Sequence, residues 1–344
     1  MVPRSFFRNS LLAGASIAVS AGAAVAQSPA PLPPGDPGMI VSVQIENDVF
    51  ARTDRNYTSG IRLGWTSPSV DAAGKDYLPD FLTEFGNMLW GPGRQRLAID
   101  FSNAIYTPKD TAAKTPDPRD RPYAGVTLGS MFLLHDTMTT RDVLGFSLGI
   151  LGPSSRGENI QNGFHDLIGD QNSAGWHHQI KDMPIVQLVT GRTWRYELTT
   201  APGTGIDVDI LPSAIVGVGS LRDYAQLGFQ LRIGQGLQSD FGTSRISPGL
   251  SGSDAYTPNR DFVWYFFAGG DGQAIGWDAT LDGNPFQSGP HVTRQPFVGE
   301  LEGGLAIIYK GVRITYTHIA QTQSFYRQRS GMFQFGSFAI STRF

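Results

Sequence analysis

The chain contains no cysteine, which excludes a disulfide framework, a zinc–thiolate site and a cysteine nucleophile. It has no run of lysine or arginine and a formal net charge of −3, so nucleic acid is not an expected partner. Its mean hydropathy of −0.16 is too polar for a helical membrane protein. What remains is a chain of 344 residues, enough for one large β domain or two ordinary domains.

The N-terminus has the three parts of an export signal. Arg4 and Arg8 precede a small, apolar stretch over residues 11–26, which ends in Ala-Val-Ala. This stretch is too short to span a membrane comfortably as a helix. We therefore expect residues 1–26 to be a signal peptide cleaved after Ala26. Residues 27–38 are rich in proline and form a lead-in to the folded domain.

The rest of the chain alternates between apolar and polar residues with a period of two. Leu227, Phe229, Leu231 and Ile233 share one face, whereas glycine, glutamine and arginine occupy the positions between them. Such strands have one apolar and one polar face. They fit a soluble sandwich, whose apolar faces meet inside, or an outer-membrane barrel, whose apolar face meets lipid.

The polar faces and the end of the chain favour the barrel. The polar faces carry charged residues such as Asp207, Arg232 and Glu300 beside many glycines, which suits a crowded, wet lumen. The last stretch, "FQFGSFAISTRF", alternates in the same way and stops on Phe344, which resembles the assembly signal of bacterial outer-membrane barrels. We therefore predict an all-β fold, a transmembrane barrel in the outer membrane formed by residues 39–344 as a single domain.

A single-chain barrel needs an even number of antiparallel strands. The alternation marks thirteen candidate strands, so one is false or two are parts of one strand. We expect residues 260–281 to be one long strand, which leaves twelve. The candidates are 39–48, 59–67, 97–106, 123–135, 142–151, 184–196, 206–218, 223–235, 260–270, 273–281, 296–309, 311–320 and 333–344.

A short helix is predicted in the outer loop at residues 152–183. Apolar residues at 160, 164, 167 and 168 have helical spacing, and Gln161 and His165 lie four residues apart on one helix face. A histidine in this position can act as a general base, and the glutamine beside it can orient water or substrate. The alternative is a loop helix with polar residues that have no catalytic role.

Several motifs in the first half of the chain resemble the lipid A deacylase family of the outer membrane. They are Asn47-Asp48, "TDRNYTSG" at 53–60, "RPYAG" at 121–125, Gln161-x-x-x-His165 and "GW" at 175–176. The resemblance implies a calcium-dependent, twelve-stranded barrel that removes the 3′-linked acyloxyacyl group from lipid A. The expected partner is lipopolysaccharide of the outer leaflet, reached by a monomer whose active site lies at the outer face.

The resemblance also implies roles for individual residues. His165 corresponds to the general base that activates water, with Gln161 beside it. Asn47 and Asp48 correspond to the pair of residues that bind the metal and stabilise the oxyanion. A hard cation such as Ca²⁺ prefers oxygen ligands. Thr58 and Ser59 are candidates for further ligand oxygens, and Lys109 is a candidate for holding a phosphate of lipid A.

Strand alternation raises a difficulty for this site. It directs Val43, Ile45 and Asn47 towards lipid but Glu46 and Asp48 inwards, so the strand must end or bulge if Asn47 and Asp48 are to share a site.

Two other functions remain open. An outer-membrane phospholipase A would need a serine nucleophile, for which Ser147 and Ser173 are available without a marking motif. A porin or other barrel without catalysis would leave the polar motifs unexplained.

Overall fold

The computed structural model of the chain describes residues 32–48, 56–70, 73–169, 171–201, 203–246, 254–329 and 331–344. The predicted signal peptide lies outside these ranges, and so do residues 49–55 of the first polar loop. All described residues belong to one unit, Leu32–Phe344.

Strands and short helices alternate along this unit as follows. The strands are β1 (Ile40–Asn47), β2 (Asn56–Thr66), β3 (Arg94–Thr107), β4 (Ala124–Asp136), β5 (Thr140–Leu151), β6 (Met183–Trp194), β7 (Tyr196–Ala201), β8 (Ile206–Gly219), β9 (Arg222–Gln235), β10 (Phe262–Asp278), β11 (Phe297–Tyr309), β12 (Val312–Gln321) and β13 (Phe333–Arg343). The helices are α1 (Asp80–Trp90), α2 (Gly157–Ile168) and α3 (Ala279–Asp282), with 3₁₀ turns η2 (Pro153–Ser155), η3 (Trp176–His178) and η4 (Leu237–Ser239).

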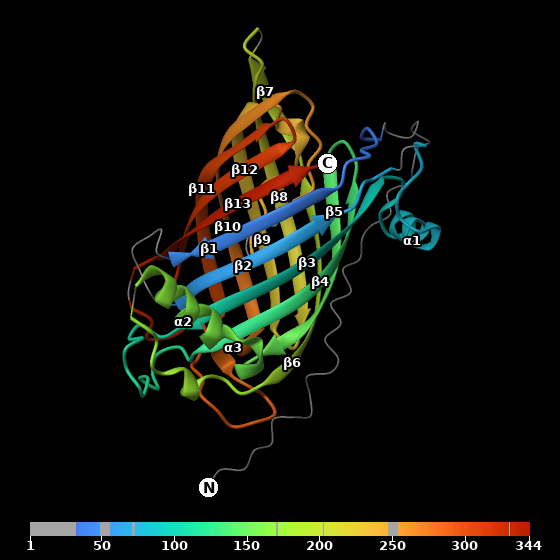
Figure 1. The fold of residues 1–344 in the computed structure, drawn as a ribbon. Coiled ribbons are helices and arrows are strands. Elements are labelled where there is room, and N and C mark those ends of the chain that lie inside the picture. Colours follow the sequence, from blue (N-terminus) through green and yellow to red (C-terminus); the bar gives the residue numbers. More distant parts are fainter. Residues whose placement is uncertain are drawn as a thin grey trace. The chain divides into compact units, whose positions relative to one another are not determined.

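The strands form a closed antiparallel barrel (Figure 1). Neighbours pair in order around the sheet, β1 pairs with β13, and the pairing of β6 with β8 closes the ring. Since β7 continues β6 after Arg195 and pairs with the same strand β8, the two segments act as one strand. The barrel therefore has twelve strands, as predicted. The interrupted candidate at 260–281 is the single strand β10 of 17 residues.

Alternation assigns the two faces of each strand, as β1 illustrates. Val41, Val43 and Ile45 are exposed on the outside of the barrel, whereas Ser42, Gln44 and Glu46 are buried in the lumen. An apolar outer face is the surface that a transmembrane barrel presents to lipid. Within the described part of the chain, no helix has the length and apolar character needed to cross a membrane.

The described residues between β9 and β10, 236–246 and 254–261, contact the inner surface of the wall. The Ser244 carbonyl accepts a hydrogen bond from Gln44 of β1 at 2.8 Å, and its hydroxyl accepts one from Arg62 of β2 at 2.7 Å. Farther along, the Ala255 carbonyl accepts a hydrogen bond from Arg141 of β5 at 3.0 Å. Because these partners lie on separate parts of the wall, we call residues 236–246 and 254–261 the plug.

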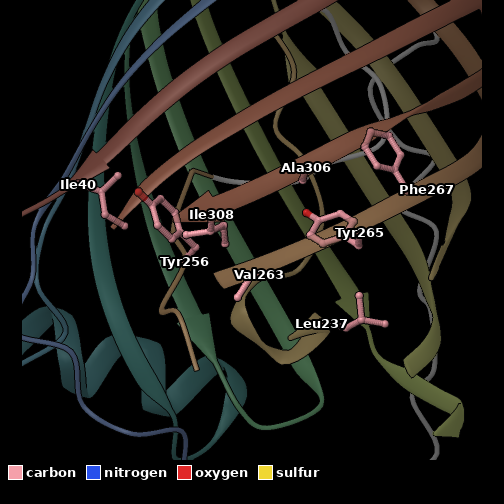
Figure 2. Packing of buried hydrophobic residues seen from close by; sticks show 8 residues of the cluster. All are labelled: Ile40, Leu237, Tyr256, Val263, Tyr265, Phe267, Ala306 and Ile308. Carbon is pink, nitrogen blue, oxygen red and sulfur yellow. The ribbon is translucent and has the colours of Figure 1, made fainter. Parts of the chain in front are cut away.

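An apolar cluster secures the base of this plug at the end of the barrel opposite α2. Figure 2 shows Leu237 and Tyr256 of the plug among inward side chains of β1, β10 and β11. The cluster consists of Ile40, Leu237, Tyr256, Val263, Tyr265, Phe267, Ala306 and Ile308. This apolar packing ties the plug to the wall.

Candidate active site on the outer surface of the wall

Helix α2 is mounted on the outward face of β3 and β4, outside the barrel. Gly125 has the outward parity of β4, since Ala124 and Val126 on either side of it are buried towards the lumen. A Cβ added to Gly125 would lie 3.0 Å from the Cα of Gly157, the first residue of α2. Glycine is therefore required here because the helix and the strand approach backbone to backbone.

The turn before α2 is held to the same outward surface. The carbonyl of Ser155 accepts hydrogen bonds from Thr127 of β4 at 2.9 Å and from the Asn103 amide of β3 at 3.2 Å. Asn103 also donates to Thr127 at 2.8 Å. These bonds fix the start of α2 against two adjacent strands.

Two of the sequence motifs complete this mounting. Tyr123 of "RPYAG" packs against Trp176 of "GW", with ring centroids 4.8 Å apart, and both cover Ile105 on β3. The Ile180 backbone N–H donates to the Tyr123 carbonyl at 3.0 Å. A Cβ on Gly175 would lie 2.8 Å from the Tyr123 ring, so this glycine allows the close packing.

Helix α2 turns its polar side to the wall and its apolar side outwards. Gln161 and His165 are buried, whereas Ile160 and Phe164 are exposed and Leu167 is 81% exposed. In water-soluble proteins the apolar stripe of a helix faces the core. The reversed arrangement suits a helix whose free side meets lipid.

His165 is held in one tautomer by the backbone. Its Nδ1 lies 2.8 Å from the carbonyl oxygen of Gln171. A carbonyl only accepts hydrogen bonds, so in the neutral ring Nδ1 carries the proton and Nε2 carries the lone pair. This is the form of imidazole that can take a proton from water.

Gln161 is oriented by Trp176. The Trp176 indole N–H donates to Gln161 Oε1 at 2.8 Å. Because an indole N–H is only a donor, the amide nitrogen of Gln161 must point the other way. This buried nitrogen has no hydrogen-bond partner among the described residues, so it can donate to a bound molecule.

Asn47 and Ser59, two of the predicted site residues, lie on the same outward surface. Asn47 is opposite Ser59 across β1 and β2, Ser59 is opposite Ile105 on β3, and Ile105 is opposite Gly125 on β4. A bulge in β2 inserts Thr58, whose hydroxyl lies 2.6 Å from that of Thr107. The row from β1 to β4 therefore joins Asn47 to the strand that carries α2.

The row from β1 to β4 bears on the difficulty that strand alternation raises for a site shared by Asn47 and Asp48. Asn47 faces outwards, as alternation requires, and the mounting of α2 lies outside the barrel too. Strand β1 ends at Asn47, directly before Asp48, whose side chain is completely buried.

Oxygen donors dominate this region, which suits a hard cation. For a bound cation, Asp48 would supply a charged carboxylate, and Asn47 and Ser59, which are paired across β1 and β2, would supply neutral oxygens. The Thr58 hydroxyl is already hydrogen bonded to Thr107. Among the described residues no three His, Asp or Glu side chains cluster as a metal site, so a cation here would depend on Asp48 with amide, hydroxyl and backbone oxygens.

Lys109 lines a polar pocket of about 350 Å³ at the α2 end. Arg119, Arg327 and Arg329 line it too, together with Asp117 and Asp120 and with Asn56, Gln328, Gly331 and Phe333. Hydrogen bonds from Arg119 lower the pKa of Asp117 to about 2, so that pair is internally neutral. Asp120 accepts hydrogen bonds from the backbone N–H groups of Lys109 and Arg121. The pocket therefore offers a surplus of cations.

Sequence reasoning missed Arg327 and Arg329 because they lie in the loop before β13, more than 200 positions from Lys109. The turn that presents them is fixed by Gln328, whose Oε1 accepts a hydrogen bond from the Ser324 N–H at 2.7 Å. Arg327 itself has a φ of 73°, a left-handed backbone conformation that non-glycine residues seldom adopt.

A separate cavity of about 270 Å³ lies inside the lumen, above the plug. Arg62, Tyr106, Arg121 and Ser147 line it. The Ser147 hydroxyl lies 2.8 Å from that of Ser130. Since Ser147 faces the lumen, the barrel wall separates it from Gln161 and His165.

The fold and this outward-facing site together define an outer-membrane β-barrel that carries a polar, ordered cluster on its lipid-facing surface. The family model described as "Outer membrane protein LpxR" matches residues 11–344. The chain therefore belongs to the LpxR family, in agreement with the family resemblance of its motifs.

LpxR from Salmonella typhimurium is similar with a TM-score of 0.71 at 19% identity, covering 89% of this chain and 100% of that chain. The β domain of the Bordetella autotransporter BrkA has a TM-score of 0.41 at 10% identity, with 90% and 99% covered. A search of curated proteins finds no match.

Proposed function

We propose that the protein is an outer-membrane esterase that removes the 3′-linked acyloxyacyl group from lipid A. The position of Gln161 and His165 carries this proposal. They lie on the side of α2 that faces the wall from outside the barrel, whereas the apolar side of α2 is exposed. A site there receives substrate from the membrane and not from the lumen. Membership of the LpxR family supports the same function.

His165 acts as the general base in this proposal. Its Nδ1–H remains bonded to the Gln171 carbonyl while Nε2 takes a proton from water, and the water oxygen attacks the ester carbonyl. The protonated ring then gives the proton to the leaving sugar oxygen, which balances the step. The Gln171 carbonyl favours the imidazolium that forms in between.

Gln161 positions the reacting groups. Its amide nitrogen, held outwards by the bond from Trp176 to Oε1, donates to the attacking water or to the ester oxygen. A donor aimed at an oxygen on which negative charge develops stabilises the transition state more than the ground state.

Asn47 and Asp48 would hold Ca²⁺, with Ser59 and Thr58 as further oxygen donors. A bound cation at this point supplies Lewis-acid stabilisation of the developing oxyanion. The span from β1 to β4 is three strand spacings, or about 14 Å. A 12-residue helix is about 18 Å long, so α2 is long enough to reach from its mounting on β4 across this distance.

Lys109 binds a phosphate group of the substrate in this proposal. Arg327 and Arg329, in the same pocket, add positive charge around it. A surplus of cations at the α2 end suits the phosphorylated sugars of lipid A, which lie at the membrane surface above the acyl chains.

Two structural observations disfavour the alternatives. Ser147 lies inside the lumen, and within the described part of the chain Ser173 has a buried hydroxyl without a hydrogen-bond partner, so neither pairs with His165 as an activated nucleophile would. The plug residues Ser244 and Ala255 bind the inner wall inside the lumen, where an open porin would have a water-filled channel.

Mass spectrometry of lipid A from cells with and without the protein tests the activity. Wild type should release the 3′-linked group, and His165→Ala should reduce the rate by roughly 10²–10⁴-fold. His291→Ala is the matched control, because His291 Nδ1 also contacts a backbone carbonyl, that of Gly289 at 3.0 Å, but in the loop before β11. Unchanged lipid A in cells that contain the folded protein would refute the proposal.

A trapping experiment separates water attack from an acyl-enzyme route. The purified protein is mixed with lipid A and quenched, and its intact mass is measured. We expect no added acyl mass, and we expect Ser147→Ala to retain the wild-type rate. An acyl adduct on Ser147 or Ser173 would favour the phospholipase-like mechanism.

A further inference from the structure

Helix α1 lies at the end of the barrel opposite α2 and is mounted on the outside of the wall (Figure 1). Gln95 has the same outward parity on β3 as Ile99 and Phe101, which are exposed. Its amide nitrogen donates to the Thr83 carbonyl at 2.9 Å and to Asn87 Oδ1 at 3.0 Å. Gln95 is buried because α1 covers it.

A second contact fixes the C-terminal end of α1. His135 has the outward parity of β4, like the exposed Met131, yet it is completely buried. Its Nε2 lies 2.8 Å from the Gly91 carbonyl, and its ring centroid lies 5.4 Å from that of Trp90. The position of α1 is therefore fixed by its contacts with β3 and β4.

The free surface of α1 is divided into an apolar and a polar sector. Phe81, Phe85, Met88 and Leu89 are all exposed, Phe81 by 67% and Met88 by 73%. At about 100° per residue these four side chains project to one side. Asp80 lies outside this sector, about 140° from Phe85, and Glu84 lies at its edge, about 40° from Met88. Gly86 and Asn87 face Gln95 on the wall.

We infer that α1 is an interfacial membrane helix whose apolar sector binds the acyl chains of phospholipids in the leaflet at its end of the barrel. The surface on which it docks is the lipid-facing wall, so its apolar sector continues the surface made by Ile99, Phe101 and Met131. Amphipathic helices of this kind lie in the interface with the apolar side buried and the polar side in water.

The charges of α1 specify the kind of lipid. The helix contains Asp80 and Glu84 and no basic residue. Its binding therefore depends on apolar area and not on attraction to anionic head groups, so zwitterionic phospholipids are sufficient. This inference depends on the outer-membrane fold and is independent of the proposed lipid A hydrolysis.

The absence of cysteine from the chain allows a direct test. A nitroxide is attached to Met88→Cys in the apolar sector, and Asp80→Cys, which is exposed outside this sector on the same helix, is the matched control. Phe101→Cys on the wall supplies the reference for a lipid-facing position. The full-length protein is reconstituted in phosphatidylethanolamine vesicles, and collision of each label with oxygen and with a water-soluble nickel chelate is measured by electron paramagnetic resonance.

We expect the Met88 label to resemble the Phe101 label, with collisions dominated by oxygen, and the Asp80 label to collide mainly with the nickel chelate. Nickel-dominated collisions at Met88 would place the apolar sector in water and overturn the inference. Spin–spin broadening between Met88 labels that disappears on dilution with unlabelled protein would show that a second copy covers this sector, and would overturn it too.

Discussion

Replacing Gly125 by alanine tests whether the site lies between α2 and the outer surface of the wall. The added Cβ would lie 3.0 Å from Gly157 Cα, and it would also collide with Ser155 Oγ. Neither atom has an easy escape, since Gly157 is backbone and Ser155 is buried with its hydroxyl donating to the Gly152 carbonyl at 2.6 Å. The start of α2 must therefore move away from β4.

The size of this movement follows from the contact distance. Two carbon atoms pack comfortably at about 3.5–4.0 Å, so α2 must shift by roughly 0.5–1 Å. A displacement of about 1 Å of a reacting group can lower a rate by roughly 10²-fold. We expect Gly125→Ala to lower the deacylation rate by roughly 10–100-fold through the displaced Gln161 and His165, while the barrel stays intact.

Gly129→Ala is the matched control. Gly129 has the same outward parity on β4, and an added Cβ would come no closer than 4.0 Å to a neighbouring atom, the Leu148 carbonyl. The assay follows release of the acyl group by mass spectrometry, and the electrophoretic shift between unheated and heated samples reports the folded barrel. A folded Gly125→Ala protein with the wild-type rate would refute the placement of the site, as would equal loss in both variants.

Three further predictions concern single contacts. Asp48→Asn should abolish calcium binding measured by calorimetry and the recovery of activity by Ca²⁺ after EGTA, whereas full wild-type activity in excess EGTA would contradict the metal role. Trp176→Phe removes one hydrogen bond of about 1 kcal/mol and should lower the rate roughly fivefold by releasing the Gln161 amide; a wild-type rate would show that this bond does not matter. Burial would raise the pKa of Asp36, but Arg343 and Arg96 outweigh it and lower the pKa from 3.8 to about 2. Asp36 therefore stabilises the fold above pH 3.8 and loses this effect as the pH falls towards 2. Asp36→Asn should lower the temperature of the electrophoretic shift at pH 7 but not at pH 2. An equal loss at both pH values would contradict the role of the ion pairs.

Local patterns were sufficient to predict the barrel, because the alternation of apolar and polar residues over a few positions identifies the two faces of each strand. The period of two along 227–233 needs no distant partner, and the chain must close with an even number of strands. Helical spacing around Gln161 and His165 likewise predicted α2, since residues four apart share a helix face whatever lies beneath. The structure confirms twelve strands and a helix at Gly157–Ile168.

Helix α1 was not predicted, although the spacing of Phe81, Phe85 and Met88 is helical. In a chain dominated by strands this signal was short, and a glycine at position 86 weakens it. Only the tertiary structure shows that this glycine is needed, because Gln95 of β3 packs against it.

Sequence by itself determined which residues of this protein point to each face of the wall and which polar residues stand out, because these properties depend on neighbours in the chain. Only the tertiary structure decided that the outward face carries the candidate site. Strand alternation alone directs Asn47 outwards. It becomes part of the candidate site because the β1–β4 pairings and the contact of Gly125 with Gly157 bring α2 to that surface. These contacts in series connect Asn47 to Gly157, which is 110 positions away in the sequence, and no local pattern specifies such a connection.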